Sequence, residues 1–201
     1  MNTFEPLIWG FKPDTEMRVA LEAGWRRSDV IWERVMERAL EAWSDSPRKP
    51  ARARARRLFR QADILARICF DAKDPRRATV AANLAVVHRA SGEQERAVRQ
   101  QCRALQIWKD VPRAIDDMQV LPRSRSSLFH LRMEALHRDT YHSNLRTRIS
   151  RIAAETEETL RTLTNGQPTP HRHASRWRGE RPTVYDGTRK VLGACLLILD
   201  E

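Results

Sequence analysis

Apolar residues recur at three- and four-residue steps along this chain, and this spacing constrains the fold more than any other feature. The clearest run spans residues 30–43 and places six apolar side chains on one helix face: Ile31, Val35, Met36, Ala39, Leu40 and Trp43. Only 7 of the 201 residues are Gly, so few positions interrupt such helices. The chain is therefore expected to be all-α, with amphipathic helices that bury their apolar faces against one another.

Proline, glycine and capping residues divide the chain into successive predicted helices. A short helix from residue 14 ends near Gly24, and Asp74-Pro75 ends one helix and begins the next, because proline is tolerated in a first turn. Gly92 closes a helix, since glycine accepts the left-handed conformation found there. The other expected helices cover 30–43, 51–72, 76–90, 93–108, 126–137 and 143–163, with 110–122 as a linker or a broken turn. Short turns between them predict stacked antiparallel helix hairpins.

The two ends of the chain differ in composition from the middle. Residues 1–13 carry aromatic side chains between two prolines, and an extended arm is expected there. Residues 14–164 form the predicted helical hairpin domain. Residues 165–180 are polar and rich in Pro, Gly, His and Arg, which is typical of a flexible linker. Residues 181–201 are expected to be a docking segment, in which 182–199 form either a hairpin around Asp186-Gly187 or a short buried helix.

Positive charge is concentrated in one stretch of the chain. Residues 48–77 contain 11 basic and 3 acidic residues, a net charge of +8, against +11 for the whole chain. The predicted 51–72 helix is basic all round in its first half, and its inward residues are expected to be Leu58, Ala62, Leu65, Ile68 and Cys69. The basic patch comprises Arg48, Lys49, Arg52, Arg54, Arg56, Arg57 and Arg60, with Arg67 further along. An acidic protein surface or a phosphate backbone would be attracted to it.

Two features of the patch favour a protein partner over nucleic acid. Arg makes up 32 of the 37 basic residues, a preference that a GC-rich coding bias can produce. Phe59 is the one aromatic side chain near the patch that could stack on bases. A nucleic-acid-associated helical protein that uses the arginine face at 48–67 is therefore kept as the alternative hypothesis.

No residue pattern typical of catalysis, metal binding or cofactor binding occurs in the sequence. There is no Gly-rich phosphate loop, no nucleophile motif and no HExxH. His171 and His173 lack a nearby third ligand, and the surrounding arginines would repel a cation. Cys69, Cys102 and Cys195 lie far apart and are expected to be ordinary buried thiols. The prediction is a protein that is not an enzyme, with no catalytic residues, no metal and no cofactor.

Residues 75–112 carry a pattern of small residues at fixed positions. The unit begins and ends near prolines, has Gly at its turn, and contains Asn83, Leu84, Ala85, Gly92, Ala97 and Ala104. This pattern resembles one unit of the tetratricopeptide repeats, in which helix pairs of about 34 residues stack into a solenoid. The resemblance implies a TPR-like stack of helix pairs, in which small residues let the two helices of a pair approach closely.

The resemblance also implies a role for Asn83. It places Asn83 at a first-helix position whose amide, in peptide-binding members, faces a concave groove and bonds the ligand backbone. The basic groove residues expected beside it are replaced here by Thr79, Ala82 and Val86, which argues against capture of a C-terminal carboxylate. Asn83 is therefore interpreted either as a partner contact or as a local polar contact.

Aromatic residues near the ends of the chain are the candidate anchors for a partner. Trp9 and Phe11 lie in the arm, and Trp177 and Tyr185 lie in the C-terminal segments. Together with Asn83 they form the predicted partner-binding set. Trp32 and Trp43, in contrast, are expected in the core.

These observations predict a class of function. The sequence has no apolar run long enough to span a membrane and no signal-peptide pattern, so a cytoplasmic location is expected. A protein partner, with an acidic surface as one option, is expected to bind the chain. The predicted function is a non-catalytic protein–protein interaction module, acting as an adaptor, an assembly factor or an accessory subunit of a larger protein.

Overall fold

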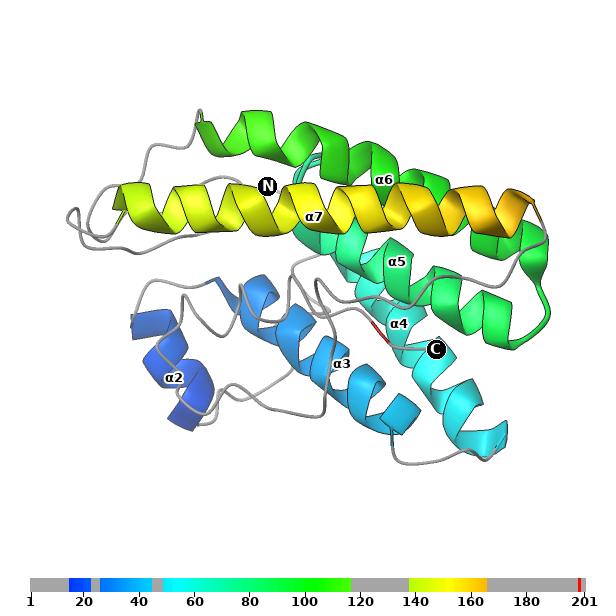
Figure 1. Cartoon of the computed structure of the whole chain (residues 1–201). Coiled ribbons are helices and arrows are strands. Elements are labelled where there is room, and N and C mark those ends of the chain that lie inside the picture. The colour runs from blue at the N-terminus through cyan, green and yellow to red at the C-terminus, as the bar shows by residue number, and fades with distance from the viewer. Residues whose placement is uncertain (1–14, 23–25, 45–48, 117–137, 166–198, 200–201) are drawn as a thin grey trace.

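The computed structural model describes residues 15–22, 26–44, 49–116, 138–165 and 199. These ranges contain the following helices (Figure 1): α2 (Thr15–Glu22), α3 (Arg27–Ser44), α4 (Lys49–Cys69), α5 (Pro75–Ala90), α6 (Gln94–Asp116) and α7 (Arg138–Thr164). No strand occurs in the described part of the chain, so the all-α prediction is confirmed there. Every helix that the structure describes is too short or too charged to cross a lipid bilayer.

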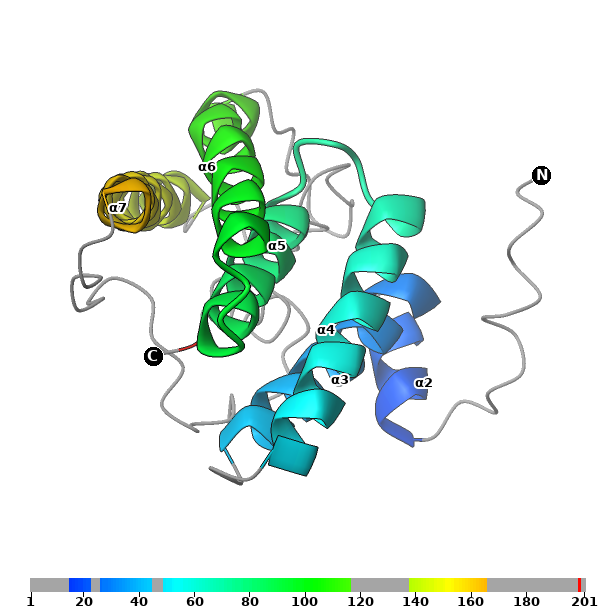
Figure 2. The same ribbon diagram turned by 90° about the vertical axis from the view of Figure 1, so that its right-hand side faces the viewer.

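Neighbouring helices in the chain pack against each other. α3 packs on α4 and α5 packs on α6, while α5 also contacts α4 and α7 lies along α6. Figure 2 shows α7 at one side, the α5–α6 pair in the middle and the α3–α4 pair at the other side. This bundle of helix pairs is compatible with a helical-repeat fold.

α5 is the central helix of the bundle, and its sequence explains this position. Thirteen of its 16 residues are buried, and alanines among them allow close approach of neighbouring helices. Its start and end are the predicted ones. The Asp74 carboxylate caps the helix by accepting a hydrogen bond from the backbone N–H of Arg76, and Pro75 occupies the first turn. Gly92 follows the helix with a φ of +73°.

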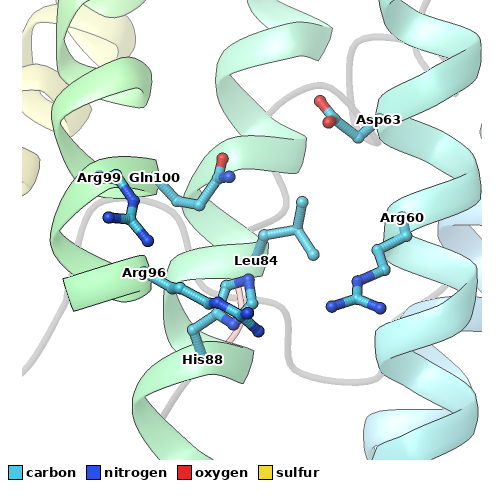
Figure 3. Close-up of a pocket in the computed structure, with 7 residues that line it drawn as sticks. All are labelled: Arg60, Asp63, Leu84, His88, Arg96, Arg99 and Gln100. Carbon is cyan, nitrogen blue, oxygen red and sulfur yellow. The ribbon is translucent and has the colours of Figure 1, made fainter. Parts of the chain in front are cut away.

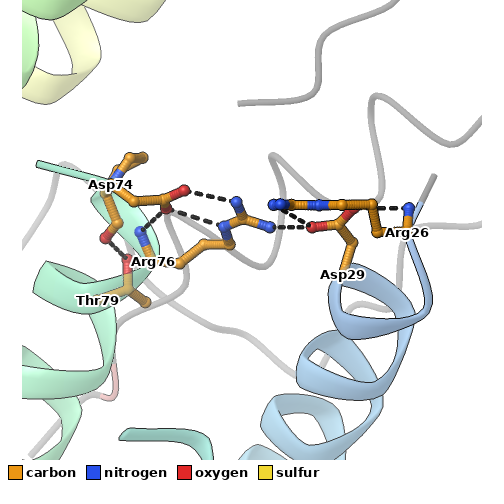
Figure 4. Close-up of polar contacts among 6 residues, drawn as sticks. Arg26, Asp29, Asp74, Arg76 and Thr79 are labelled. Atoms are coloured by element: carbon orange, nitrogen blue, oxygen red, sulfur yellow. Dashed lines mark hydrogen bonds and ion pairs between the residues drawn. The ribbon is translucent and has the colours of Figure 1, made fainter. Parts of the chain in front are cut away.

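A buried arginine joins the start of α5 to the start of α3 (Figure 4). Arg76 is 0% exposed and donates hydrogen bonds to Asp74 through Nε and Nη2, at 2.8 and 2.5 Å, and to Asp29 through Nη1, at 2.7 Å. Its guanidinium carbon lies 3.3 Å from the ring centre of Phe70. Asp29 also accepts a hydrogen bond from the backbone N–H of Arg26, just before α3. The network therefore ties the N-terminal ends of α3 and α5 together through fully paired charges.

α6 and α7 are longer than the sequence predicts. α6 was expected to end at Trp108, with a linker or a broken turn over 110–122, but it continues through Pro112 to Asp116. Proline removes one backbone donor, yet Trp108 and Val111 are both fully buried in this part of the helix, and their packing offsets that loss. α7 begins at Arg138 rather than at residue 143, because residues 138–142 include no Gly or Pro that would stop it.

Two predicted burials are wrong. Ile68, expected inward, is 46% exposed, because α4 contacts α3 and α5 on its other sides. Cys102, expected to be a buried thiol, is exposed on α6, and Cys69 is partly buried. The core placement of Trp32 is confirmed, since it is 0% exposed, and Trp43 packs against the core as a partly buried side chain.

Several predicted segments lie outside the described residues. They are the arm at 1–13, the helix at 126–137, Cys195, and the C-terminal segments apart from residues 165 and 199. The choice between a hairpin and a helix at 182–199 therefore stays open.

Candidate functional site

The outward side of α4 combines arginines with apolar side chains. We define the α4 outer face as Arg57, Gln61, Ile64 and Ile68, which recur at four- and three-residue steps and are all exposed. Ile64 is 57% exposed and Ile68 is 46% exposed. Among the described residues, these two are the large apolar side chains that are exposed to solvent. Arg57 has no ion-pair partner in the described ranges. The face therefore presents an apolar centre beside uncompensated positive charge.

The predicted basic patch is divided by the fold into paired and unpaired arginines. Arg54, Arg57 and Arg60 are exposed, whereas Arg56 is partly buried and binds Glu93 through both Nη atoms, at 2.6 and 2.8 Å. Arg52 is exposed, with its guanidinium carbon 5.6 Å from the ring centre of Trp43. Lys49 is the first residue of α4, and Arg48 lies outside the described residues. The patch is thus smaller than the sequence predicts, because α4 uses Arg56 to hold the α5–α6 turn.

A cavity lies beside the patch, where α4, α5 and α6 meet (Figure 3). Its volume is about 340 Å³, and we call it the basic cavity; its lining consists of Arg60, Asp63, Leu84, His88, Arg96, Arg99 and Gln100. Figure 3 shows Arg60 pointing from α4 toward α6, where Arg96 lies beside His88 and Arg99 lies further from Arg60. Three arginines therefore line one cavity.

The carboxylates next to the basic cavity are already bound by other cations. Asp63 forms ion pairs with Arg67, at 2.7 Å, and with Arg103, at 2.8 Å. Glu93 accepts from Arg56, from Arg96 at 2.8 Å and from His88 Nδ1 at 3.0 Å. Hydrogen bonds led by that from Arg56 lower the pKa of Glu93 to about 2. Because Glu93 is then an acceptor only, His88 must carry its proton on Nδ1.

Two groups near the basic cavity have pKa values that burial lowers. Burial lowers the pKa of His88 below its ordinary 6.5, Glu93 opposes the change, and the cations Arg56 and Arg60 add to the lowering. Arg77, which is partly buried, has its pKa lowered by burial and by the nearby Arg103 and Arg67, while Asp63 and Asp74 oppose the change. For both groups burial is the largest cause of the lowered pKa, and nearby arginines add to it while carboxylates oppose it.

Asn83 lies on a different side of α5, and the chain itself occupies its amide. Asn83 is fully buried; its Nδ2 donates to the carbonyl of Thr79 at 3.0 Å, and its Oδ1 accepts from the backbone N–H of Leu199 at 2.7 Å. Leu199 is itself 1% exposed and packs in the core. A backbone N–H does bond this amide, as the repeat resemblance implies for a ligand, but it comes from the same chain. A role for Asn83 in partner binding stays a prediction.

The other predicted site residues are not brought together by the described structure. Trp9, Phe11, Trp177 and Tyr185 lie outside the described residues. The residues of the basic cavity other than Arg60 were missed by sequence reasoning. Arg96 and Arg99 do share one face of α6, but nothing local shows that Arg60, more than 30 residues earlier, lies opposite them.

The described residues contain no group of three or more His, Cys, Asp or Glu side chains that could hold a metal ion. Comparisons with protein-family models, with curated proteins and with solved structures gave no match.

Proposed function

We propose that this chain is a non-catalytic protein-interaction module that docks an acidic protein partner on the α4 outer face. The observation that carries the proposal is the exposure of Ile64 and Ile68, one helical turn apart, beside arginines without carboxylate partners. Single exposed apolar residues are ordinary, but a pair next to strong charge is typical of an interface with an apolar centre and a polar rim. A partner with acidic residues around an apolar patch complements this face in both respects.

The scaffold of the module fits a TPR-like stack of helix pairs. The capped start of α5 at Asp74, the turn at Gly92 and the buried alanines Ala97 and Ala104 of α6 support this interpretation. Such stacks expose helix faces over a rigid core, which suits an adaptor, an assembly factor or an accessory subunit.

A second candidate function is association with nucleic acid. The exposed Arg54, Arg57 and Arg60 on one helix favour it, since phosphates attract such a row. Two findings favour protein instead: Arg56 is paired with Glu93, and the outer face has isoleucines where a stacking platform would need aromatic rings.

The test is a capture experiment with a matched pair of variants. The tagged chain, the double variant Ile64→Asp/Ile68→Asp, and the control Cys102→Asp/Gln106→Asp are each used to purify partners from the source cells, with nuclease and at moderate and high salt. The control adds the same charge at the same spacing to exposed positions of α6. We expect one stoichiometric protein that the control retains and that the isoleucine variant loses by about tenfold, a change of about 1.4 kcal/mol.

Equal capture by the two variants would overturn docking on the α4 outer face. Loss of all bound material after nuclease treatment would instead favour the nucleic-acid alternative, because the nuclease removes the nucleic acid itself. Steep loss of binding between moderate and high salt would agree with that alternative, since phosphate contacts weaken steeply with salt.

A further inference from the structure

The basic cavity has more positive charge than the helix bundle needs. Arg60 has no ion-pair partner in the described part of the chain, and Arg99 lies 3.9 Å from a Glu95 side chain that is 91% exposed. Such a long, solvated pair contributes little. Arg96 and Arg56 hold Glu93, and Arg103 and Arg67 hold Asp63, so both nearby carboxylates are satisfied without Arg60 or Arg99. These two guanidinium groups are therefore available to a ligand.

Polar groups in the wall of the cavity can add to these two arginines. The Oε1 atom of Gln100 is buried and has no hydrogen-bond partner in the described residues. Since a side-chain amide can turn over, Gln100 can offer its NH₂ group to a bound anion instead. Arg96 uses Nη1 for Glu93, which leaves other N–H groups on the same guanidinium. The cavity can thus surround one anionic group with donors from α4 and α6.

We propose that the basic cavity binds a phosphate monoester dianion. Several guanidinium forks match the three oxygens and the charge near −2 of a phosphoryl group, whereas a carboxylate offers two oxygens and a single charge. The volume of about 340 Å³ leaves room for the molecule that carries the phosphate. Leu84 is the apolar residue in the lining, and no Phe, Tyr or Trp of the described residues lines the cavity for base stacking, so a nucleic-acid strand fits less well.

The same chemistry occurs in a free phosphorylated small molecule and in a phosphorylated side chain of a protein. Both carry a group with a charge near −2 at neutral pH and three acceptor oxygens. The cavity opens beside the α4 outer face but uses none of the residues that define it. The proposal therefore stands independently of the docking proposal, and the two can fail separately.

The test measures binding of O-phosphoserine to the full chain by calorimetry at constant ionic strength. The variant Arg60→Gln/Arg99→Gln removes the two available cations, and the control Arg38→Gln/Arg151→Gln removes the same charge from exposed positions outside the cavity and outside the basic patch. We expect the cavity variant to bind at least about tenfold more weakly, equivalent to about 1.4 kcal/mol, and the control to bind like the unmodified chain. All four positions are exposed, and circular dichroism checks that each variant stays helical.

The following results would overturn the proposal. They are absence of binding, equal weakening by the two variants, and binding of glutamate as tight as that of O-phosphoserine. Displacement of O-phosphoserine by a single-stranded oligonucleotide at equal phosphate concentration would also overturn it, in favour of phosphodiester recognition.

A further arm identifies the source of the phosphate. A short peptide that contains phosphoserine is compared with free O-phosphoserine, with the unphosphorylated peptide as its control. Tighter binding of the phosphopeptide, abolished by Arg60→Gln/Arg99→Gln, supports the proposal with a phosphorylated protein as ligand. Equal affinity of the phosphopeptide and of O-phosphoserine supports it with a free phosphorylated molecule.

Discussion

Arg76 and the arginines of α4 show how differently one residue type is used in this bundle. Arg76 is fully buried, bonded to two buried carboxylates and in contact with Phe70. Arg54, Arg57 and Arg60 are exposed and have no carboxylate partner in the described ranges. A buried charge must be paired to be tolerated, whereas an exposed one is hydrated and available. Arg76 therefore serves the fold, and the α4 arginines can serve binding.

The largest expected effect is that of Arg76→Met. Methionine keeps most of the side-chain volume but leaves Asp29 and Asp74 as buried carboxylates without their main cation. We expect the free energy of unfolding to fall by about 3–5 kcal/mol, measured by urea denaturation.

A second variant separates lost charge pairing from poor packing. In Asp29→Asn/Asp74→Asn/Arg76→Met none of the three buried charges of this network is left, and asparagine still caps a helix. We expect this triple variant to be more stable than Arg76→Met alone. A triple variant that is no more stable would mean that packing of the guanidinium, and not charge pairing, is what the site provides.

A smaller effect is expected from enlarging an alanine in α5. Ala81 is 0% exposed in the centre of the bundle, whereas Ala53 is exposed on α4. Ala81→Leu should cost about 1–3 kcal/mol of unfolding free energy, because a close-packed interface must move apart to admit the extra carbons. Ala53→Leu is the matched control and should stay within about 0.5 kcal/mol of the unmodified chain. Equal stabilities in thermal or urea unfolding would contradict the burial of α5 on all sides.

The pH dependence of stability should reveal the lowered pKa of His88. Because burial and the nearby cations lower the pKa of His88 in the folded chain, the unfolded chain binds a proton more readily near 6.5. The free energy of unfolding should therefore fall as pH decreases from about 8 to about 5, the range in which histidine titrates. We expect His88→Gln to flatten this slope in pH-dependent urea unfolding. An unchanged slope would show that His88 is not the titrating group.

The smallest effect on stability is expected for Arg57→Met on the α4 outer face. Arg57 is exposed and makes no ion pair in the described residues, so its loss should change the free energy of unfolding by no more than about 0.5 kcal/mol. The same change should slow association with an acidic partner at low salt, because rim charges mainly set the association rate. A large loss of stability would show that Arg57, like Arg76, stabilises the folded chain.

The sequence predicts some parts of this molecule better than others. The start of α5 at Asp74-Pro75 and the turn at Gly92 follow from local backbone chemistry, and both are confirmed. The end of α6 was mispredicted because Trp108 and Val111 are held by tertiary packing that outweighs the effect of Pro112. In the candidate site, the exposed arginines of α4 were predicted, but Arg96, Arg99 and Gln100 of the basic cavity were not.

The sequence by itself determined the helical class, the main helix positions and the concentration of positive charge in residues 48–77. Periodicity and capping are properties of neighbouring residues, so they can be read without knowing the fold. The tertiary structure alone decided that Arg76 is buried, that Ile68 faces outward, and that Arg60 lies across a cavity from Arg96 and Arg99. These outcomes depend on which helix covers which face, and that choice is made by contacts between residues far apart in the chain.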